Sequence, residues 1–230
     1  MVGGIRGQVN EPMELAVSRR VVGEKSRLHS LRGSECPDYA HLVVSSTKVY
    51  DSRMRARFSV FIATSLDGYI ARADGSIDWL SIVHPVDEAH GYDTFMSSVD
   101  TIVIGRRTYE TVLEYETWPY FAKRVIVMTH RPAKAHHAEE FYSGSALKLA
   151  NRLTDARRVY VDGGNVLSQF FAAGLIDDVT ISVIPIVLGN GIRLFSGGEG
   201  EHRLELESSR SWPSGMVQMR YRLRAVSTDI

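Results

Sequence analysis

Hydrophobic positions between residues 57 and 223 follow two alternating patterns. Short, nearly continuous apolar runs rich in β-branched residues are typical of strands that are buried on both faces. Apolar residues that recur every three to four positions are typical of helices with one buried face. The expected strands are Phe58–Ser65, Thr101–Gly105, Arg124–Thr129, Arg158–Asp162 and Val179–Leu188. The expected helices lie over Val86–Val99, Tyr109–Leu113, Ala146–Leu153 with Ser145 as its cap, and Val166–Leu175.

This alternation predicts an α/β fold with a mainly parallel central sheet and helices on both faces. After Gly198 the pattern changes to two strands, about Arg203–Ser209 and Met216–Leu223, which predict a C-terminal antiparallel hairpin. We expect one domain over residues 55–226. Ligands of such sheets bind where the parallel strands end, so the residues that follow each strand are the candidates for chemistry.

Residues 1–54 do not continue this pattern. Their weak helix pattern, Glu14–Val22, and weak strand pattern, Ala40–Val44, have no neighbour with a matching apolar face. Met54 directly precedes the first well-formed strand. We therefore expect residues 1–54 to be a disordered or non-native N-terminal extension.

Composition narrows the classes of function that are expected for this chain. The chain has 230 residues and equal numbers of basic and acidic side chains, 27 of each, which disfavours nucleic-acid and membrane-surface partners. Cys36 is the only cysteine and the 8 histidines are scattered, so neither a disulfide within the chain nor a metal site is expected. No apolar run reaches membrane-spanning length or resembles a secretion signal, and we expect a cytoplasmic protein.

Two strands end in glycine directly before a helix, in TIVIGRRTYE and in RVYVDGGNVL. Glycine lets a ligand approach the backbone, and the free amides at a helix start attract phosphate. Each junction alone is an ordinary glycine turn, but two of them favour one shared phosphate ligand. Neither matches GxGxxG or GxxxxGK[ST], which disfavours a standard Rossmann domain or a P-loop. The residues expected to bind this ligand are Gly105, Arg106, Arg107, Thr108, Gly163, Gly164, Asn165 and Val166.

A third segment, ATSLDGYIARADGSIDW, follows the first strand. Its Asp-Gly pairs are turn formers, but Asp67 stands directly after the strand, where a substrate is expected. Trp79 is a candidate wall for a flat heterocycle and equally a candidate core residue.

These segments, in order and followed by GLIDDVTISVIPIVLGNGIRLF, resemble the reductase domain of riboflavin biosynthesis and the wider dihydrofolate-reductase-like superfamily, above all its stand-alone bacterial members. The resemblance covers about residues 57–223. It implies NADPH as cofactor, a small heterocyclic substrate and a homodimer. It also implies that Ala63 and Thr64 line the nicotinamide, that Thr129 contacts the adenosine phosphate, and that Gly163 and Gly164 pack on the pyrophosphate and nicotinamide ribose.

Hydride transfer also requires a proton for the reduced product. Folate reductases use a carboxylate on the helix after the first loop, and Asp87 and Glu88 lie in the first turn of the helix expected here. The helix dipole alone also favours carboxylates at that place. Asp67 is a further candidate for substrate contact and catalysis. A ribose-phosphate substrate would need a second basic site, for which Arg193 is the candidate, although a surface arginine beside a glycine turn explains it equally well.

The leading hypothesis is an NADPH-dependent reductase of the type that acts on 5-amino-6-(5-phosphoribosylamino)uracil. The alternatives are a dihydrofolate or pteridine reductase and a non-catalytic NADPH-binding protein. Folate reductases usually place an arginine just before the third strand, where Lys123 and Arg124 stand here. The zinc deaminase that is often fused to the riboflavin reductase carries a His-Ala-Glu and a Pro-Cys-x-x-Cys signature. His137-Ala138-Glu139 matches the first part, but the second does not occur, because Cys36 is the only cysteine.

Overall fold

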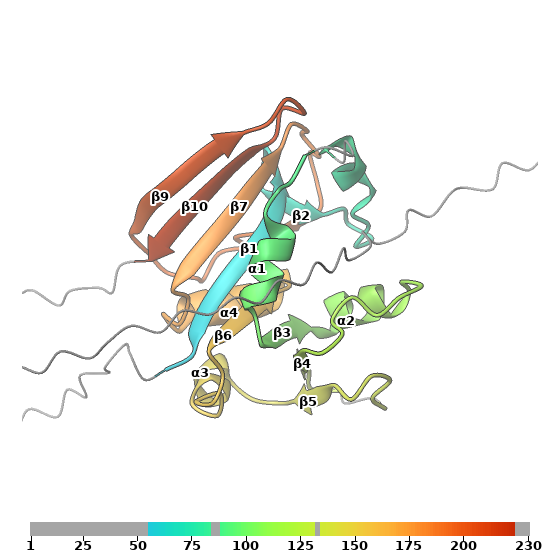
Figure 1. The fold of residues 1–230 in the computed structure, drawn as a ribbon, viewed down its shortest axis with the longest axis vertical. Helices are drawn as coiled ribbons and strands as arrows, with labels where there is room; N and C mark the ends of the chain where they lie inside the picture. Colours follow the sequence, from blue (N-terminus) through green and yellow to red (C-terminus); the bar gives the residue numbers. More distant parts are fainter. Residues whose placement is uncertain (1–54, 84–87, 132–133, 224–230) are drawn as a thin grey trace, which may run out of the picture. The chain divides into compact units, whose positions relative to one another are not determined.

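The computed structural model describes residues 55–83, 88–131 and 134–223. Within these residues, eight strands form one sheet in the order β5-β4-β3-β6-β1-β7-β10-β9 (Figure 1). The strands from β5 to β7 run parallel, whereas β10 is antiparallel to β7 and β9 is antiparallel to β10. The strands are β1 (Arg57–Ser65), β3 (Thr101–Gly105), β4 (Arg124–Met128), β5 (Glu140–Tyr142), β6 (Arg158–Asp162), β7 (Asp178–Ile184), β9 (Leu204–Ser211) and β10 (Val217–Leu223).

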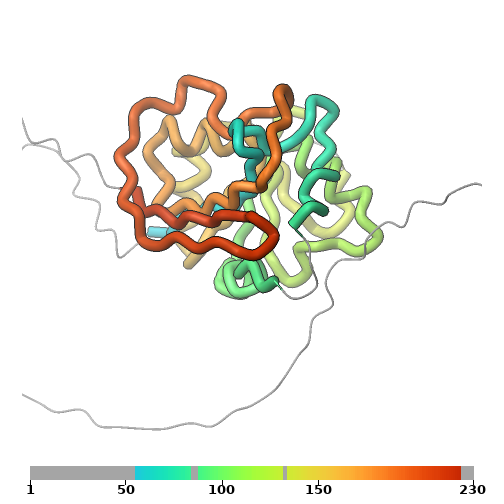
Figure 2. The backbone as a smooth tube through the Cα atoms, turned by 90° about the horizontal axis from the view of Figure 1, so that it is seen from above, coloured from blue at the N-terminus to red at the C-terminus, as the bar shows by residue number. Residues whose placement is uncertain are grey.

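The predicted fold class is confirmed, including the mainly parallel sheet and the C-terminal hairpin. Figure 2 shows the chain from above; the hairpin of β9 and β10 forms one edge of the sheet. The helices are α1 (Tyr92–Ser98), α2 (Arg106–Leu113), α3 (Ala146–Ala150) and α4 (Gly164–Ala172). The short elements β2 (Tyr69–Ala71) and β8 (Ile192–Arg193) pair with each other, and η1 (Asp78–Val83) is a 3₁₀ helix.

Helices cover both faces of the sheet. Successive strand residues point to opposite sides, so a continuous apolar run makes both faces apolar and both are buried by helices. On β3, for example, Val103 packs in one apolar cluster with residues of α3 and α4. Its neighbours Ile102 and Ile104 pack in a second cluster with residues of α1 and α2. The near-continuous apolar runs of the sequence are therefore explained by burial on both sides.

Some element boundaries differ from the prediction. The last parallel strand ends at Ile184 and not at Leu188, because Pro185 has no N–H to continue the ladder. The first helix begins at Tyr92, after Gly91 with φ 79°, rather than near Val86. Short elements such as β5 were not predicted. The patterns expected within residues 1–54 lie outside the described residues.

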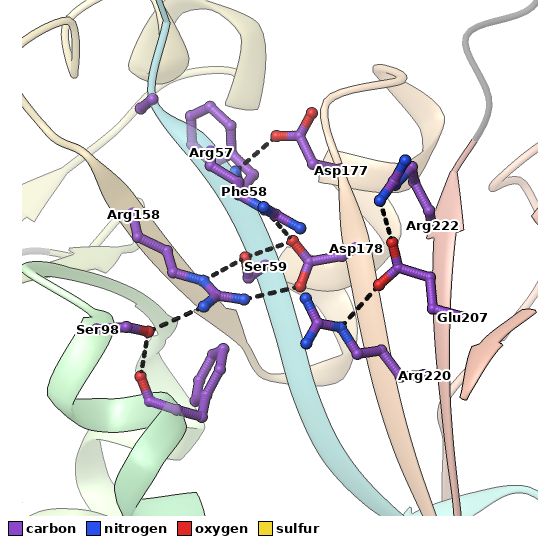
Figure 3. A network of polar contacts seen from close by, with 12 residues as sticks. Arg57, Phe58, Ser59, Ser98, Arg158, Asp177, Asp178, Glu207, Arg220 and Arg222 are labelled. Carbon is purple, nitrogen blue, oxygen red and sulfur yellow. Dashed lines mark hydrogen bonds and ion pairs between the residues drawn. The ribbon is translucent and has the colours of Figure 1, made fainter. Parts of the chain in front are cut away.

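Polar contacts tie together the amino ends of three adjacent strands, β6, β1 and β7 (Figure 3). The side chain of Asp178 is only 1% exposed. Its carboxylate accepts hydrogen bonds from Arg57 Nε at 2.5 Å, Ser59 Oγ at 2.8 Å and Arg158 Nη2 at 2.9 Å. This network fixes the strands at one end of the sheet, and the other end, where the parallel strands finish, is left for the site described next.

Candidate cofactor and substrate site

A cavity of ≈ 1070 Å³ lies at the carboxyl ends of the parallel strands. Its lining includes the residues that follow β3, β4 and β6, together with Phe61–Ala63 of β1. The volume lies slightly above the roughly 300–1,000 Å³ that is usual for small-molecule sites, which suits a site that holds two molecules at once.

The two glycine junctions lie side by side in this cavity. Strands β3 and β6 are neighbours in the sheet. A Cβ atom built on Gly163 would lie 3.4 Å from the backbone nitrogen of Gly105 and 2.7 Å from Thr108 Oγ1. A Cβ on Gly105 would lie 3.3 Å from Val166 Cγ2. The contact that the sequence predicted between the two junctions is confirmed.

Both helices that start at these junctions begin without a side-chain cap. The N-cap residues of α2 and α4 are Gly105 and Gly163, and neither start has a side-chain hydrogen bond. In contrast, the Ser145 side chain accepts a hydrogen bond from the Lys148 amide and caps α3, as predicted. The first amides of a helix have no partner within the helix. The starts of α2 and α4 therefore present N–H groups that suit the phosphates of a dinucleotide.

The two arginines at the start of α2 differ in their surroundings. Arg106 donates to Glu110 at 2.7 Å and to the carbonyl oxygen of Arg131. Arg107 is exposed at the cavity lining, and within the described parts of the chain no hydrogen bond or ion pair engages its guanidinium. Thr129 also lines the cavity, and its hydroxyl accepts a hydrogen bond from the Arg131 amide at 3.0 Å. Arg107 is thus the cation with most freedom to bind an added phosphate.

Asp162, the last residue of β6, is a lining residue that the sequence reasoning missed. Burial raises the pKa of its carboxyl, and the hydrogen bond that its Oδ1 accepts from the Gly163 amide at 2.6 Å only partly opposes this. The site therefore favours a carboxyl that holds its proton to higher pH than an exposed aspartate does. Its position at the carboxyl end of a predicted strand was a usable signal, but the Asp-Gly-Gly run predicts in the first place a turn that binds phosphate.

Four tyrosines surround this carboxyl in the cavity lining. Burial raises the pKa of each phenol, and the nearby Asp162 charge raises it further. One ring comes from α1, one from β6 and two from the segment between α2 and β4, so sequence spacing alone did not bring them together. They are Tyr92, Tyr115, Tyr120 and Tyr160.

Most residues predicted to bind the cofactor line the cavity. Thr64 is the exception, because it is 4% exposed within β1 and is not a lining residue. The lining residues of the predicted set are Ala63, Gly105, Arg106, Arg107, Thr108, Thr129, Gly163, Gly164, Asn165 and Val166.

Asp67 does not line the cavity. Its carboxylate accepts hydrogen bonds from Ser65 Oγ at 2.6 Å and from the amides of Leu188 and Gly189 at 3.0 and 2.7 Å. The Ser65 hydroxyl, together with these amides, lowers the pKa of Asp67 to about 2. Asp67 therefore joins the end of β1 to the loop after β7, and a role in substrate contact is not supported.

Trp79 and Arg193, the other residues predicted to contact substrate, also lie outside the lining. Trp79 is 2% exposed and packs with Val83, Ile184 and other apolar residues, so it belongs to the core. The Arg193 guanidinium lies 4.7 Å from the ring centre of Tyr69. A cation–π contact therefore holds the side chain that was expected to bind a substrate phosphate.

The carboxylates predicted for the first turn of α1 are not found there. Asp87 lies outside the described residues, and Glu88 precedes the helix, which begins only at Tyr92. Glu88 accepts hydrogen bonds from the Ser214 amide at 2.9 Å and the Ser214 hydroxyl at 2.6 Å. Burial opposes the charge of Glu88, but these bonds and His90 outweigh it and lower the pKa. Glu88 thus binds the hairpin turn and is not a lining residue of the cavity.

In the described ranges, His, Cys, Asp and Glu side chains do not gather in groups of three that could hold a metal ion. No helix in those ranges has the length and apolar character needed to cross a membrane.

The fold and the site define an α/β domain with a cavity at the carboxyl ends of its parallel strands, into which two glycine-to-helix junctions open. The family model described as the RibD C-terminal domain matches residues 58–218, and the chain belongs to this family.

Three known proteins show how far the similarity extends. The uncharacterized protein YwjB of Bacillus subtilis is 35% identical over 173 residues, which are 73% of this chain and 98% of that protein. A putative riboflavin biosynthesis protein from Shewanella sp. PV-4 has 32% identity and a TM-score of 0.68, over 74% of this chain and 99% of its own. A dihydrofolate reductase from Enterococcus faecalis, complexed with NADP(H), has 13% identity and a TM-score of 0.54, over 75% of this chain and 99% of its own. The last comparison shows that the fold is dihydrofolate-reductase-like.

Proposed function

We propose that this chain is an NADPH-dependent reductase of the riboflavin-biosynthesis type, which transfers a hydride to a small heterocyclic substrate. The observation that carries the proposal is the contact between two uncapped glycine-to-helix junctions at the carboxyl ends of β3 and β6. The dihydrofolate reductase that shares the fold is complexed with NADP(H), which supports the same kind of ligand here. The family match supports reductase chemistry.

In this proposal the chain binds NADPH through backbone and side-chain groups of the cavity. The amides at the starts of α2 and α4 bind the phosphates, since both starts lack a side-chain cap. Arg107 and Thr129 bind the adenosine phosphate, and Ala63 of β1 faces the nicotinamide. The bound cofactor would supply the hydride.

Asp162 supplies the proton that the reduced product requires. It is a lining residue, and its buried environment keeps the carboxyl protonated to higher pH than usual. The aromatic side chains around it limit the access of water to the reacting atoms. This assignment replaces Asp67 and Glu88, whose carboxylates are bound elsewhere in the fold.

A titration with NADPH and NADH tests cofactor binding. We expect wild-type protein to bind NADPH more tightly than NADH. Arg107→Ala should weaken NADPH binding about 10- to 100-fold, because a hydrogen bond to a charged group is worth about 1.5–3 kcal/mol, and it should leave NADH binding unchanged. The matched control is Arg157→Ala, since Arg157 is 88% exposed and directly precedes β6, at the opposite end of that strand from Asp162.

Turnover is measured by the loss of NADPH absorbance. The candidate substrates are 5-amino-6-(5-phosphoribosylamino)uracil, a dihydropterin and dihydrofolate. Oxidation with any of them supports a reductase and selects among the riboflavin, pteridine and folate types. Binding of NADPH without oxidation across the panel would favour a non-catalytic binding protein. Equal affinity for NADPH and NADH would contradict the assignment of Arg107.

A further inference from the structure

Tyr160 is a buried tyrosine of β6 whose side chain is held at both ends. It is 4% exposed and lines the cavity. Its ring contacts the ring of Phe95 edge to face, with the ring centres 5.3 Å apart. Its hydroxyl donates a hydrogen bond to the carbonyl oxygen of Phe61 at 3.1 Å. The place of the hydroxyl is therefore fixed by packing and by a hydrogen bond.

The pairing of β1 with β6 places this hydroxyl beside the carboxyl of Asp162. The two strands are parallel, and Ser59 pairs with Tyr160. Continued by two residues, this register brings Phe61 level with Asp162, and side chains two positions apart on a strand share one face. A hydroxyl that is bonded to the Phe61 carbonyl thus lies at the level of the Asp162 side chain. In agreement with this geometry, a hydrogen bond between the two side chains affects the pKa of both.

Other groups give the charged form of Asp162 little support. Its Oδ1 accepts a hydrogen bond from the Gly163 amide at 2.6 Å. Among the described residues, no arginine, lysine or histidine is bonded to this carboxyl. The titratable and charged side chains that line the rest of the cavity are Asp74, Tyr92, Arg106, Arg107, Glu110, Glu114, Tyr115, Tyr120, His130 and Tyr142. Tyr160 is therefore the described side chain that is placed to bond to Asp162 as its proton leaves.

A phenol can bond to both forms of a carboxyl, but the two bonds differ in strength. The phenol oxygen accepts a hydrogen bond from the neutral acid, and the hydroxyl donates one to the carboxylate. A charged partner makes a hydrogen bond roughly twice as strong. The Phe61 carbonyl, which holds the hydroxyl hydrogen of Tyr160 in the structure, is a neutral acceptor. A carboxylate formed beside it is the stronger acceptor and draws this hydrogen away.

We propose that Tyr160 is a positioning residue for proton transfer, and that its hydroxyl turns from the Phe61 carbonyl to the Asp162 carboxylate as the proton passes to the substrate. The O–H bond of Asp162 breaks, its electron pair stays on the carboxylate, and the proton bonds to the substrate atom that hydride transfer has made basic. Tyr160 keeps its own proton, because burial raises the pKa of its phenol. This inference rests on the proposed reductase function and deepens it.

The titration of the Asp162 carboxyl tests the inference without any turnover. In the full chain, labelled with ¹³C at the aspartate carboxyl carbons, NMR follows each carboxyl with pH, and the Asp162 signal is identified by its loss in Asp162→Asn. Tyr160→Phe should lower the acid dissociation constant of Asp162 at least about threefold, because the carboxylate loses a charge-assisted hydrogen bond. The aromatic ring is kept, so we expect the variant to fold.

The matched control is Tyr120→Phe. Tyr120 is also buried and lines the cavity, but it is not a hydrogen-bond partner of Asp162. Its phenol is neutral at the pH where an aspartate titrates, because burial raises the pKa of that phenol. The control variant should therefore leave the titration of Asp162 unchanged.

The pH profile of turnover gives a second readout, with a substrate that the wild-type protein reduces. In Tyr160→Phe, the pH at which kcat falls should move upward by as much as the NMR midpoint of Asp162. The plateau of kcat should fall about 2- to 10-fold while KM for NADPH is unchanged, because the hydroxyl acts on the proton and not on cofactor binding. A purely structural role of Tyr160 would not move the pH profile.

An unchanged titration of Asp162 in Tyr160→Phe would overturn the inference, and so would an equal change in Tyr120→Phe. The proposed function fails by a different result, namely the absence of NADPH binding or of its oxidation across the substrate panel. The titration of Asp162 needs neither cofactor nor substrate, so the two failures are distinguishable.

Discussion

The substitution Asp178→Asn tests how the sheet is held together at the end opposite the cavity. Asp178 is 1% exposed on β7 and binds two arginines from neighbouring strands (Figure 3). Asparagine keeps the size of the side chain and an acceptor oxygen for Ser59, so the change removes mainly the negative charge. We expect the variant to fold and to be less stable.

The expected loss follows from the two ion pairs. The Arg158 side chain is 19% exposed, and a buried hydrogen bond between charged groups contributes about 1.5–3 kcal/mol. The Arg57 side chain is 44% exposed, so its pair contributes about 0–1 kcal/mol. Arg158 also keeps hydrogen bonds to the hydroxyls of Ser59 and Ser98, both at 2.9 Å. The free energy of unfolding should therefore fall by about 2–4 kcal/mol, less than for a fully buried pair.

Equilibrium unfolding in urea, followed by tryptophan fluorescence, measures this loss. With a slope of about 2 kcal/mol per molar urea, in the middle of the usual range, the midpoint should fall by about 1–2 M. The matched control is Asp155→Asn, because Asp155 is 76% exposed and lies 3.6 Å from Arg124. It should change stability by less than about 0.5 kcal/mol. Equal effects of the two substitutions would refute the reasoning, because burial would then not decide the strength of the pair.

Three other predictions concern stability and catalysis. Burial opposes the charge of Glu139, but Tyr109 and two backbone amides outweigh it and lower the pKa to about 2. Wild-type protein should therefore lose about 3 kcal/mol more stability than Glu139→Gln as the pH falls from about 4.5 to 2. Gly163→Ala should lower the unfolding free energy by about 1–3 kcal/mol even without ligand, because φ is 93° and the new Cβ would meet Thr108 Oγ1. Asp162→Asn should reduce turnover about 10²- to 10⁴-fold. The wild-type rate should fall as the pH rises through the raised pKa of Asp162, and this pH dependence should disappear in the variant.

Each of these has an outcome that contradicts it. Identical acid profiles for wild type and Glu139→Gln would show that the buried carboxylate does not control acid stability. An unchanged pH profile in Asp162→Asn would remove Asp162 as the proton source. The control for that variant is Asp93→Asn, an exposed aspartate in the first turn of α1 that does not line the cavity.

Gly163 also shows why a bulky substitution there is a poor test of cofactor binding. From the sequence alone, a side chain at this position is expected to occupy the space of a phosphate. In the structure it would also strain the backbone and meet Thr108, so loss of binding would follow from loss of the fold. Arg107, which is exposed at the cavity lining, is the better probe.

The sequence by itself determined the parallel strands, the hairpin and the two glycine junctions. These features are local, since a buried strand needs a run of apolar residues and a helix start without a side-chain cap is visible as glycine. The right-handed crossover rule then limits how the strands can be ordered. For this reason the side-by-side position of the Gly105 and Gly163 junctions could be predicted from the sequence.

Only the tertiary structure decided which side chains face the cavity. Asp67 and Asp162 both lie at the carboxyl end of a parallel strand, but the carboxylate of Asp67 is bound by amides that stand 121 and 122 residues further along the chain. The positions of Arg193 and Glu88 were likewise decided by distant partners that sequence spacing does not predict. Arg193 packs on the ring of Tyr69, and Glu88 accepts a hydrogen bond from Ser214. The physical reason is that a polar side chain binds the nearest group able to satisfy it, and folding brings that group from a distant part of the chain.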